Sequence, residues 1–197
     1  MQNTSNNNLI KELRELTGAG MMEIKNALNE AGNNKDKAVE ILRKKGALKA
    51  GKKADRVANE GLVEAYIHPG SRVGVLVEVN CETDFVSRTA DFKTLVKELA
   101  LHIAAANPLY ADIANVPAEV VEKEKEIYKE SVKGKPQDVI NKILEGKIAK
   151  YYEETCLMQQ PYCKNPDIKV KDLIGEAVAK MGEKVVVKRF SRFVLGN

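Results

Sequence analysis

The sequence contains few of the residue types that most often carry enzyme chemistry. It has two histidines, three cysteines and no tryptophan in 197 residues. Cys81, Cys156 and Cys163 are odd in number and irregularly spaced, which argues against a disulfide framework and against a zinc site. No serine, cysteine or carboxylate clusters beside His68 or His102 in the pattern of an activated nucleophile. These absences predict a protein that is not an enzyme and whose three thiols are reduced.

Motifs that bind nucleotides or direct a chain to a membrane are also missing. Neither the P-loop pattern G-x-x-x-x-G-K-S/T nor the dinucleotide pattern G-x-G-x-x-G occurs. No apolar stretch approaches the roughly 20 residues needed to span a bilayer. The polar, asparagine-rich residues 1–8 resemble neither a signal peptide nor a transit peptide. We therefore expect a cytoplasmic protein that itself binds no nucleotide, cofactor, metal or membrane.

Charged residues are abundant and nearly balanced. Lysines and arginines number 32 and acidic residues 28, which gives a net charge of +4. The exception is residues 43–56, where seven basic residues stand against one acid, Asp55. A charge run of this kind usually forms a solvated helix or linker. Less common interpretations are a patch that steers an acidic partner and a site for nucleic-acid phosphates, and we do not expect nucleic-acid binding.

Three helices are predicted over residues 9–46. Glycines separate them: Gly18 and Gly20 follow the first helix, Gly32 follows the second, and Gly46 is expected to end the third. Each helix carries an apolar stripe at helical spacing. The stripes consist of Leu9, Leu13 and Leu16, then Ile24, Ala27, Leu28 and Ala31, then Ala38, Ile41 and Leu42. This pattern predicts a compact N-terminal domain at residues 1–46, similar in size and layout to a ubiquitin-associated domain, followed by a basic linker or helix at residues 47–60.

Strand patterns appear only in the remaining part, residues 61–197. Valine alternates with other residues over residues 73–79, which is typical of a strand, and an earlier alternating segment lies at residues 63–67. Pro69-Gly70-Ser71 supplies a turn between them. A terminal strand is expected at residues 185–195, where it would have to pair with this hairpin across a long stretch of chain.

Helical patterns dominate between the hairpin and the terminal strand. We expect helices over most of residues 92–181, with a break at residues 134–136 and a loop at residues 155–169. Residues 61–197 are therefore predicted to form an α+β core, with a small antiparallel sheet of about three strands covered by helices on one face.

Two short segments hold residues whose place in the fold is ambiguous. Met21 and Met22 are neighbours on the second helix, so both cannot face the bundle. They are either flexible gap fillers or a soft contact for a partner helix. Asp84 and Phe85 follow the strand at residues 73–79. General preferences would make Phe85 a core residue and Asp84 the start of a helix.

Four segments, at residues 17–22, 74–86, 160–162 and 189–196, resemble the elongation factor Ts family, and the likeness covers almost the whole chain. Two of these motifs are long and stand in the right order, which makes the resemblance highly specific. It implies a guanine-nucleotide exchange factor that binds elongation factor Tu·GDP and promotes GDP release during translation elongation. No chemical reaction of its own is implied.

The resemblance also implies which residues contact the partner. The Asp84–Phe85 pair would enter the GTPase domain of elongation factor Tu near its magnesium and phosphate site, which makes Phe85 an exposed anchor rather than a core residue. The methionine pair would touch the same domain, and the histidine at the hairpin turn is a weaker candidate for the partner's far domain. The expected contacts are Thr83, Asp84, Phe85, Val86, Met21, Met22 and His68.

One departure from longer family members bears on assembly. Those members have two related core subdomains and a protruding helical hairpin, whereas this chain has room for one core subdomain. The resemblance implies that short members compensate by dimerising, so we expect a homodimer, with an interface at the terminal strand or near Cys156 to Cys163. Two other functions stay open: a nucleic-acid-binding accessory protein using residues 43–56, and a ubiquitin-binding adaptor using the first 46 residues.

Overall fold

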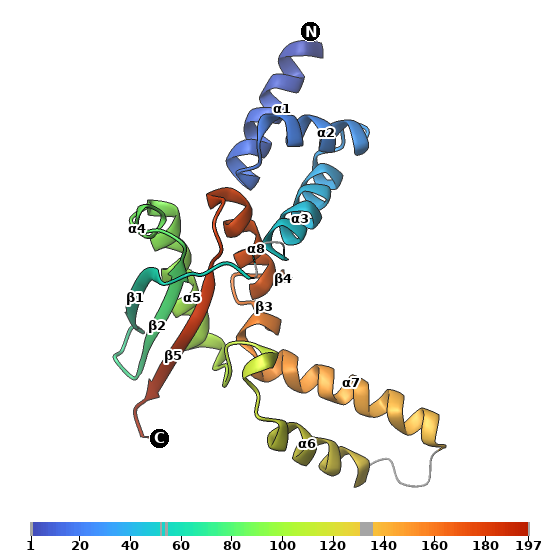
Figure 1. Cartoon of the computed structure of the whole chain (residues 1–197), viewed down its shortest axis with the longest axis vertical. Helices are drawn as coiled ribbons and strands as arrows, with labels where there is room; N and C mark the ends of the chain where they lie inside the picture. The colour runs from blue at the N-terminus through green and yellow to red at the C-terminus, as the bar shows by residue number, and fades with distance from the viewer. Residues whose placement is uncertain (1, 52, 54, 131–135, 197) are drawn as a thin grey trace.

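The structure is a computed structural model that describes residues 2–51, 53, 55–130 and 136–196. An N-terminal group of three helices lies at one end, a three-stranded sheet with its covering helices forms the middle, and a helical hairpin extends from the other end (Figure 1). The predicted α+β class, with three helices followed by a three-stranded antiparallel sheet, is confirmed.

The N-terminal helices are α1 (Gln2–Thr17), α2 (Met21–Glu30) and α3 (Lys35–Gly51). Gly18 turns the chain between α1 and α2 with a φ of 64°, a conformation that costs glycine little. The buried residues come from the predicted stripes of all three helices. They are Leu13, Ile24, Ala27, Leu28, Ala38 and Leu42.

The prediction that Gly46 ends the third helix is wrong, because α3 continues to Gly51. The reason lies in packing against α8 (Val170–Met181). A Cβ atom at Gly46 would lie 3.2 Å from the Cβ of Ala179, so the missing side chain allows the two helices to approach closely. Glycine therefore serves here as a contact point inside a helix rather than as a stop.

The main sheet consists of β1 (Glu60–Ile67), β2 (Val73–Cys81) and β5 (Val186–Val194), in the order β1-β2-β5. Both pairings are antiparallel, and the second contains a bulge between Glu78 and Val79. The terminal strand thus pairs with the hairpin, as predicted.

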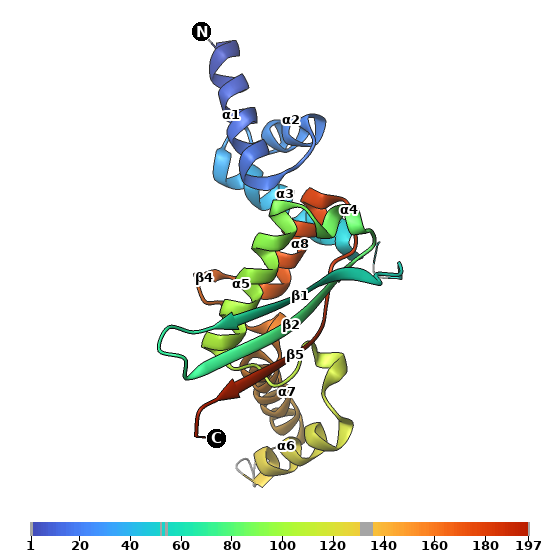
Figure 2. The same cartoon turned by 90° about the vertical axis from the view of Figure 1, so that its left-hand side faces the viewer.

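Helices cover one face of this sheet. Helix α5 (Ala90–Ala106) lies across it, and α8 completes the layer (Figure 2). The alternating valines Val75, Val77 and Val79 point toward this layer and are buried there with Phe92 of α5. The opposite face of the sheet carries no helix in the described part of the chain.

The loop prediction for residues 155–169 is wrong in part. The segment contains a 3-10 helix, η2 (Leu157–Gln159), and a small hairpin, β3 (Pro161–Tyr162) with β4 (Asn165–Lys169). His102 of α5 binds the two residues on either side of β3: its Nε2 lies 3.0 Å from Gln160 Oε1, and its Nδ1 accepts a hydrogen bond from the Cys163 amide. Because burial lowers the pKa of His102, the ring is neutral and can keep both bonds.

Two helices extend away from the sheet as an antiparallel hairpin, α6 (Ala118–Glu130) and α7 (Gln137–Thr155) (Figure 1). A hairpin of this kind was associated above with longer chains, and this shorter chain has one too. The expected break at residues 134–136 lies outside the described residues, except for Pro136, which immediately precedes α7. Within the described ranges, no helix is long and apolar enough to cross a membrane.

Gly61 offers a direct test of how the β1–β2 pairing depends on a single backbone position. Its φ is 149°, and a Cβ atom there would lie 2.1 Å from the carbonyl oxygen of Val79. We expect Gly61→Ala to lower the free energy of unfolding by about 2–3 kcal/mol, since a side chain must push the strands apart. Urea unfolding followed by circular dichroism measures this value.

Gly146 in α7 is the matched control. Nothing lies within 4 Å of a Cβ atom at this position. Gly146→Ala should therefore raise the free energy of unfolding by about 0.5–1 kcal/mol, because alanine favours the helix. Equal effects of the two substitutions would contradict the packing described at Gly61.

Candidate protein-binding site

The predicted site lies at the corner where β2 ends and the single-turn helix α4 (Asp84–Ser87) begins. Thr83 is the N-cap residue of α4, and its hydroxyl accepts a hydrogen bond of 3.5 Å from the amide of Val86. At the other end of the turn, the Ser87 hydroxyl donates to the carbonyl of Asp84 at 2.9 Å. Local hydrogen bonds therefore close a four-residue helix that would be too short to persist alone.

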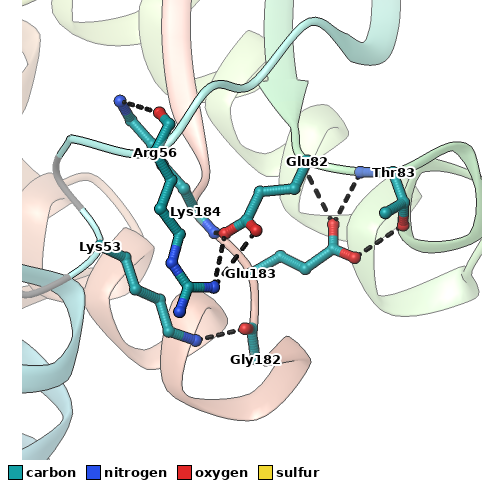
Figure 3. Close-up of polar contacts among 7 residues, drawn as sticks. All are labelled: Lys53, Arg56, Glu82, Thr83, Gly182, Glu183 and Lys184. Carbon is teal, nitrogen blue, oxygen red and sulfur yellow. Dashed lines mark hydrogen bonds and ion pairs between the residues drawn. The ribbon is translucent and has the colours of Figure 1, made fainter.

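A carboxylate from far along the chain secures this corner. Glu183 follows α8, and its Oε2 accepts hydrogen bonds from the amides of Glu82 (3.1 Å) and Thr83 (3.0 Å). Its Oε1 accepts a third bond, of 2.6 Å, from the Thr83 hydroxyl (Figure 3). One side chain therefore satisfies the two backbone donors of the corner and orients the capping hydroxyl.

Glu82 makes the reverse connection. Its Oε1 accepts a hydrogen bond of 2.6 Å from the amide of Lys184, and Arg56 Nη1 lies 3.2 Å from its Oε2 (Figure 3). The bond from the Lys184 amide, together with Arg56, holds the pKa of Glu82 below its ordinary value against the opposing effect of burial. The carboxylate is therefore ionised at neutral pH and remains an acceptor for both partners.

The side chains at the corner point in different directions. Phe85 is 78% exposed, so the interpretation of Phe85 as a core residue is wrong. Val86, its neighbour, is partly buried and packs against the main core instead. Asp84 is also accessible, and its carboxylate forms an ion pair of 2.7 Å with Arg88 on the surface. An aromatic ring and a carboxylate are thus presented together on a fixed turn.

Cys81 lies beneath the corner and closes the end of β2. Its thiol is fully buried and donates a hydrogen bond of 3.1 Å to the carbonyl of Thr83. Burial, with the nearby charge of Glu183, raises the pKa of Cys81 to about 11. The thiol is therefore protonated and unreactive at neutral pH, and its role here is structural.

The methionine pair opens α2 at some distance along the chain. Met21 is 51% exposed and Met22 is 67% exposed, so neither fills a gap in the bundle. The turn just before them rests on α8: a Cβ atom at Gly18 would lie 2.3 Å from Cγ of Lys180. The structure therefore anchors both the Met21–Met22 turn and the Asp84–Phe85 corner to the C-terminal end of α8.

His68 lies at the other end of the sheet. It sits in the β1–β2 turn, where its amide donates to the carbonyl of Val73 and its Nδ1 lies 3.2 Å from the Tyr66 hydroxyl. The nine residues of β2 separate this turn from the corner, which corresponds to about 30 Å at the usual rise per residue of a strand. Figure 2 shows the β1–β2 turn and α4 at opposite ends of the sheet. His68 therefore belongs to a separate surface.

The basic residues at 43–56 are largely engaged within the chain. Ion pairs join four of them to acidic residues: Arg43 to Glu176, Lys44 to Glu40, Lys45 to Glu30 and Arg56 to Glu82. Lys53 donates to the carbonyl of Gly182 (Figure 3). The segment therefore connects the N-terminal helices to the core as a linker, and its described basic side chains make bonds within the chain.

Comparisons with known proteins agree with the motifs at this site. The protein-family model described as Elongation factor TS matches residues 2–197. The chain is 57% identical over 190 residues to a protein named Elongation factor Ts from Caldanaerobacter subterraneus subsp. tengcongensis, covering 95% of each chain. It is 55% identical over 189 residues to the protein of that name from Thermotoga petrophila, covering 96% of this chain and 95% of the relative. The chain belongs to the elongation factor Ts family.

Proposed function

We propose that this protein binds elongation factor Tu in its GDP state and promotes release of the nucleotide during translation elongation in the cytoplasm. The observation that carries the proposal is Phe85, a large aromatic side chain held 78% exposed on a hydrogen-bonded turn. Burying such a ring in a partner is favourable, whereas leaving it in water contributes nothing to folding. The protein itself catalyses no chemical reaction.

Exchange requires a large difference in affinity between two states of the partner. Shifting an equilibrium by about 10⁴ takes roughly 5.5 kcal/mol of differential binding. One buried aromatic ring supplies about 2 kcal/mol, so Phe85 cannot act alone. By linkage, GDP must weaken the binding of this protein by the same factor by which this protein weakens the binding of GDP.

Other exposed residues would have to supply the remaining contacts with the partner. In this proposal Asp84 acts beside Phe85 near the phosphate and magnesium site of the partner, with Thr83 and Val86 at the edge of the contact. Met21 and Met22 add flexible apolar surface of the kind that adapts to a partner helix. His68, at its distance from the corner, would reach another domain of the same partner.

The two alternative functions receive less support. A nucleic-acid-binding role would use residues 43–56, but acidic residues of this chain already pair with Arg43, Lys44, Lys45 and Arg56. A ubiquitin-binding adaptor would leave the corner at Phe85 and the whole sheet without a role.

The rate of GDP release tests the proposed function. With fluorescent GDP bound to elongation factor Tu, the wild-type chain should accelerate release. Phe85→Ala should reduce the acceleration about 30-fold, which corresponds to the loss of about 2 kcal/mol. Asp84→Ala should also reduce the acceleration. Normal acceleration by the double variant Asp84→Ala/Phe85→Ala would contradict the role assigned to these two residues.

Two controls separate binding from folding in this experiment. Phe85→Ala should change the free energy of unfolding by less than about 0.5 kcal/mol, because the ring is mostly in water. Ile127→Ala alters an equally apolar side chain, 60% exposed on α6, and should leave GDP release unchanged.

We further propose that the protein is a homodimer joined through the open face of its sheet. Four large apolar side chains lie on this face and are exposed: Val63 (69%), Ile67 (63%), Leu76 (48%) and Phe193 (67%). The strand register places them on the side opposite the buried valines. Cys156 is buried, and Cys163 lies on the helical side against His102, so the dimer is expected to use β5 rather than the segment from Cys156 to Cys163.

The oligomeric state tests this second proposal. Sedimentation equilibrium should give twice the 21.8 kDa mass of one chain. Leu76→Glu should produce monomers, because a buried, unpaired carboxylate cannot be accommodated in an apolar interface. Ile127→Glu places the same charge on α6 and should leave the dimer intact. A wild-type protein that sediments as a monomer at micromolar concentration would contradict the proposal.

A further inference from the structure

Glu82 and Glu183 form a reciprocal pair between two loops. The carboxylate of Glu183 accepts hydrogen bonds from the amides of Glu82 and Thr83, and the carboxylate of Glu82 accepts one from the amide of Lys184 (Figure 3). Each loop therefore supplies both a side-chain acceptor and a backbone donor to the other. An arrangement of this kind fixes the distance and the direction between the loops more strictly than a single bond.

A third segment joins the same pair. Arg56 contacts the Glu82 carboxylate, and its own carbonyl accepts a hydrogen bond of 2.8 Å from Lys184 Nζ. Lys53 binds the carbonyl of Gly182. The chain that leaves the N-terminal helices is thus attached to the loops that carry Glu82 and Glu183.

The turn before Met21 and Met22 also contacts the C-terminal end of α8, close to Glu183. Gly18, in this turn, packs on Lys180 in the last turn of α8, and Lys180 forms an ion pair of 2.8 Å with Asp91 at the start of α5. Residues 180–184 therefore contact both Gly18, which precedes the methionine pair, and the corner that carries Phe85. We infer that a change in residues 180–184 would move this corner relative to the N-terminal helices.

We propose that Glu183, together with Glu82, is a positioning residue for nucleotide exchange. This inference rests on the proposed function. The Glu82–Glu183 pair sets the direction in which α4 presents Asp84 and Phe85, without itself entering the partner. It acts by preorganisation: the four-residue helix has little stability alone, and a side chain that is already ordered loses less freedom on binding.

Removing the pair has a specific consequence at the corner. Without the Glu183 carboxylate, the amides of Glu82 and Thr83 lose their acceptor, and the Thr83 hydroxyl loses the bond that orients it toward Val86. The turn can then adopt other directions while the apolar side of the corner, at Val86 and Cys81, stays packed. We therefore expect loss of exchange activity with little loss of the folded state.

A double-mutant cycle on GDP release tests this inference. Glu183→Ala should lower the maximal stimulated rate at least tenfold, measured at saturating concentrations of this protein. In the Phe85→Ala background, Glu183→Ala should slow release by much less than tenfold, because the ring is gone and only Asp84 is left to be positioned. Glu183→Gln retains one oxygen for the two amides and should recover part of the rate.

Asp172→Ala is the matched control. The Asp172 carboxylate accepts a hydrogen bond of 3.0 Å from the Lys169 amide at the opposite end of α8. The Asp172→Ala substitution therefore removes a carboxylate-to-backbone hydrogen bond at the other end of the same helix. It should leave the rate of GDP release unchanged. If Glu183→Ala fails to fold, as judged by circular dichroism, Glu183→Gln carries the same cycle.

The outcomes separate the inference from the proposed function. Normal activity of Phe85→Ala would overturn the proposed function itself. Reduced activity of Phe85→Ala with normal activity of the Glu183 variants would overturn the positioning role alone. The positioning role would also be overturned if the fold-reductions caused by Glu183→Ala and Phe85→Ala multiplied in the double variant, because multiplied effects indicate independent sites.

Discussion

The structure depends on one contact between distant parts of the chain, the Glu183 carboxylate with the amides of Glu82 and Thr83. These residues are about 100 positions apart in sequence. An exposed aromatic ring on a short turn would ordinarily fold back onto the nearest apolar surface. Here Val86 occupies that surface, and the carboxylate holds the turn from the other side, so Phe85 remains in water. Exposure of the ring is therefore a property of the fold.

The two proposed partners use different exposed apolar side chains of the core. Phe85 stands beside a charged residue on a small turn, which fits insertion into a partner that must open. Val63, Ile67, Leu76 and Phe193 form a flat surface on the open side of the sheet, which fits a second copy of the same surface. The Glu78–Arg189 ion pair lies on this face as well and could set the register of such a contact.

Much of the fold could be predicted from local patterns. The alternating valines at residues 73–79 predicted β2, and the spacing of Ile24, Ala27 and Leu28 predicted the buried side of α2. What could not be predicted depends on contacts between distant residues. In the sequence, Glu183 follows the glycine that ends a helix and cannot be told apart from an ordinary surface acid. Gly46 has the sequence pattern of a helix end, and only its packing against α8 explains why the helix continues. For the exposure of Phe85, the family resemblance was informative where burial statistics were not.

Photo-cross-linking from position 85 tests the central claim most directly. With Phe85 replaced by p-benzoylphenylalanine, irradiation should attach this chain to the GTPase domain of elongation factor Tu, and excess GDP should reduce the yield because the two ligands oppose each other. The same group at Ile127, on α6, serves as the control and should give no such product. Absence of a cross-link from position 85, or a yield that GDP does not change, would contradict the account.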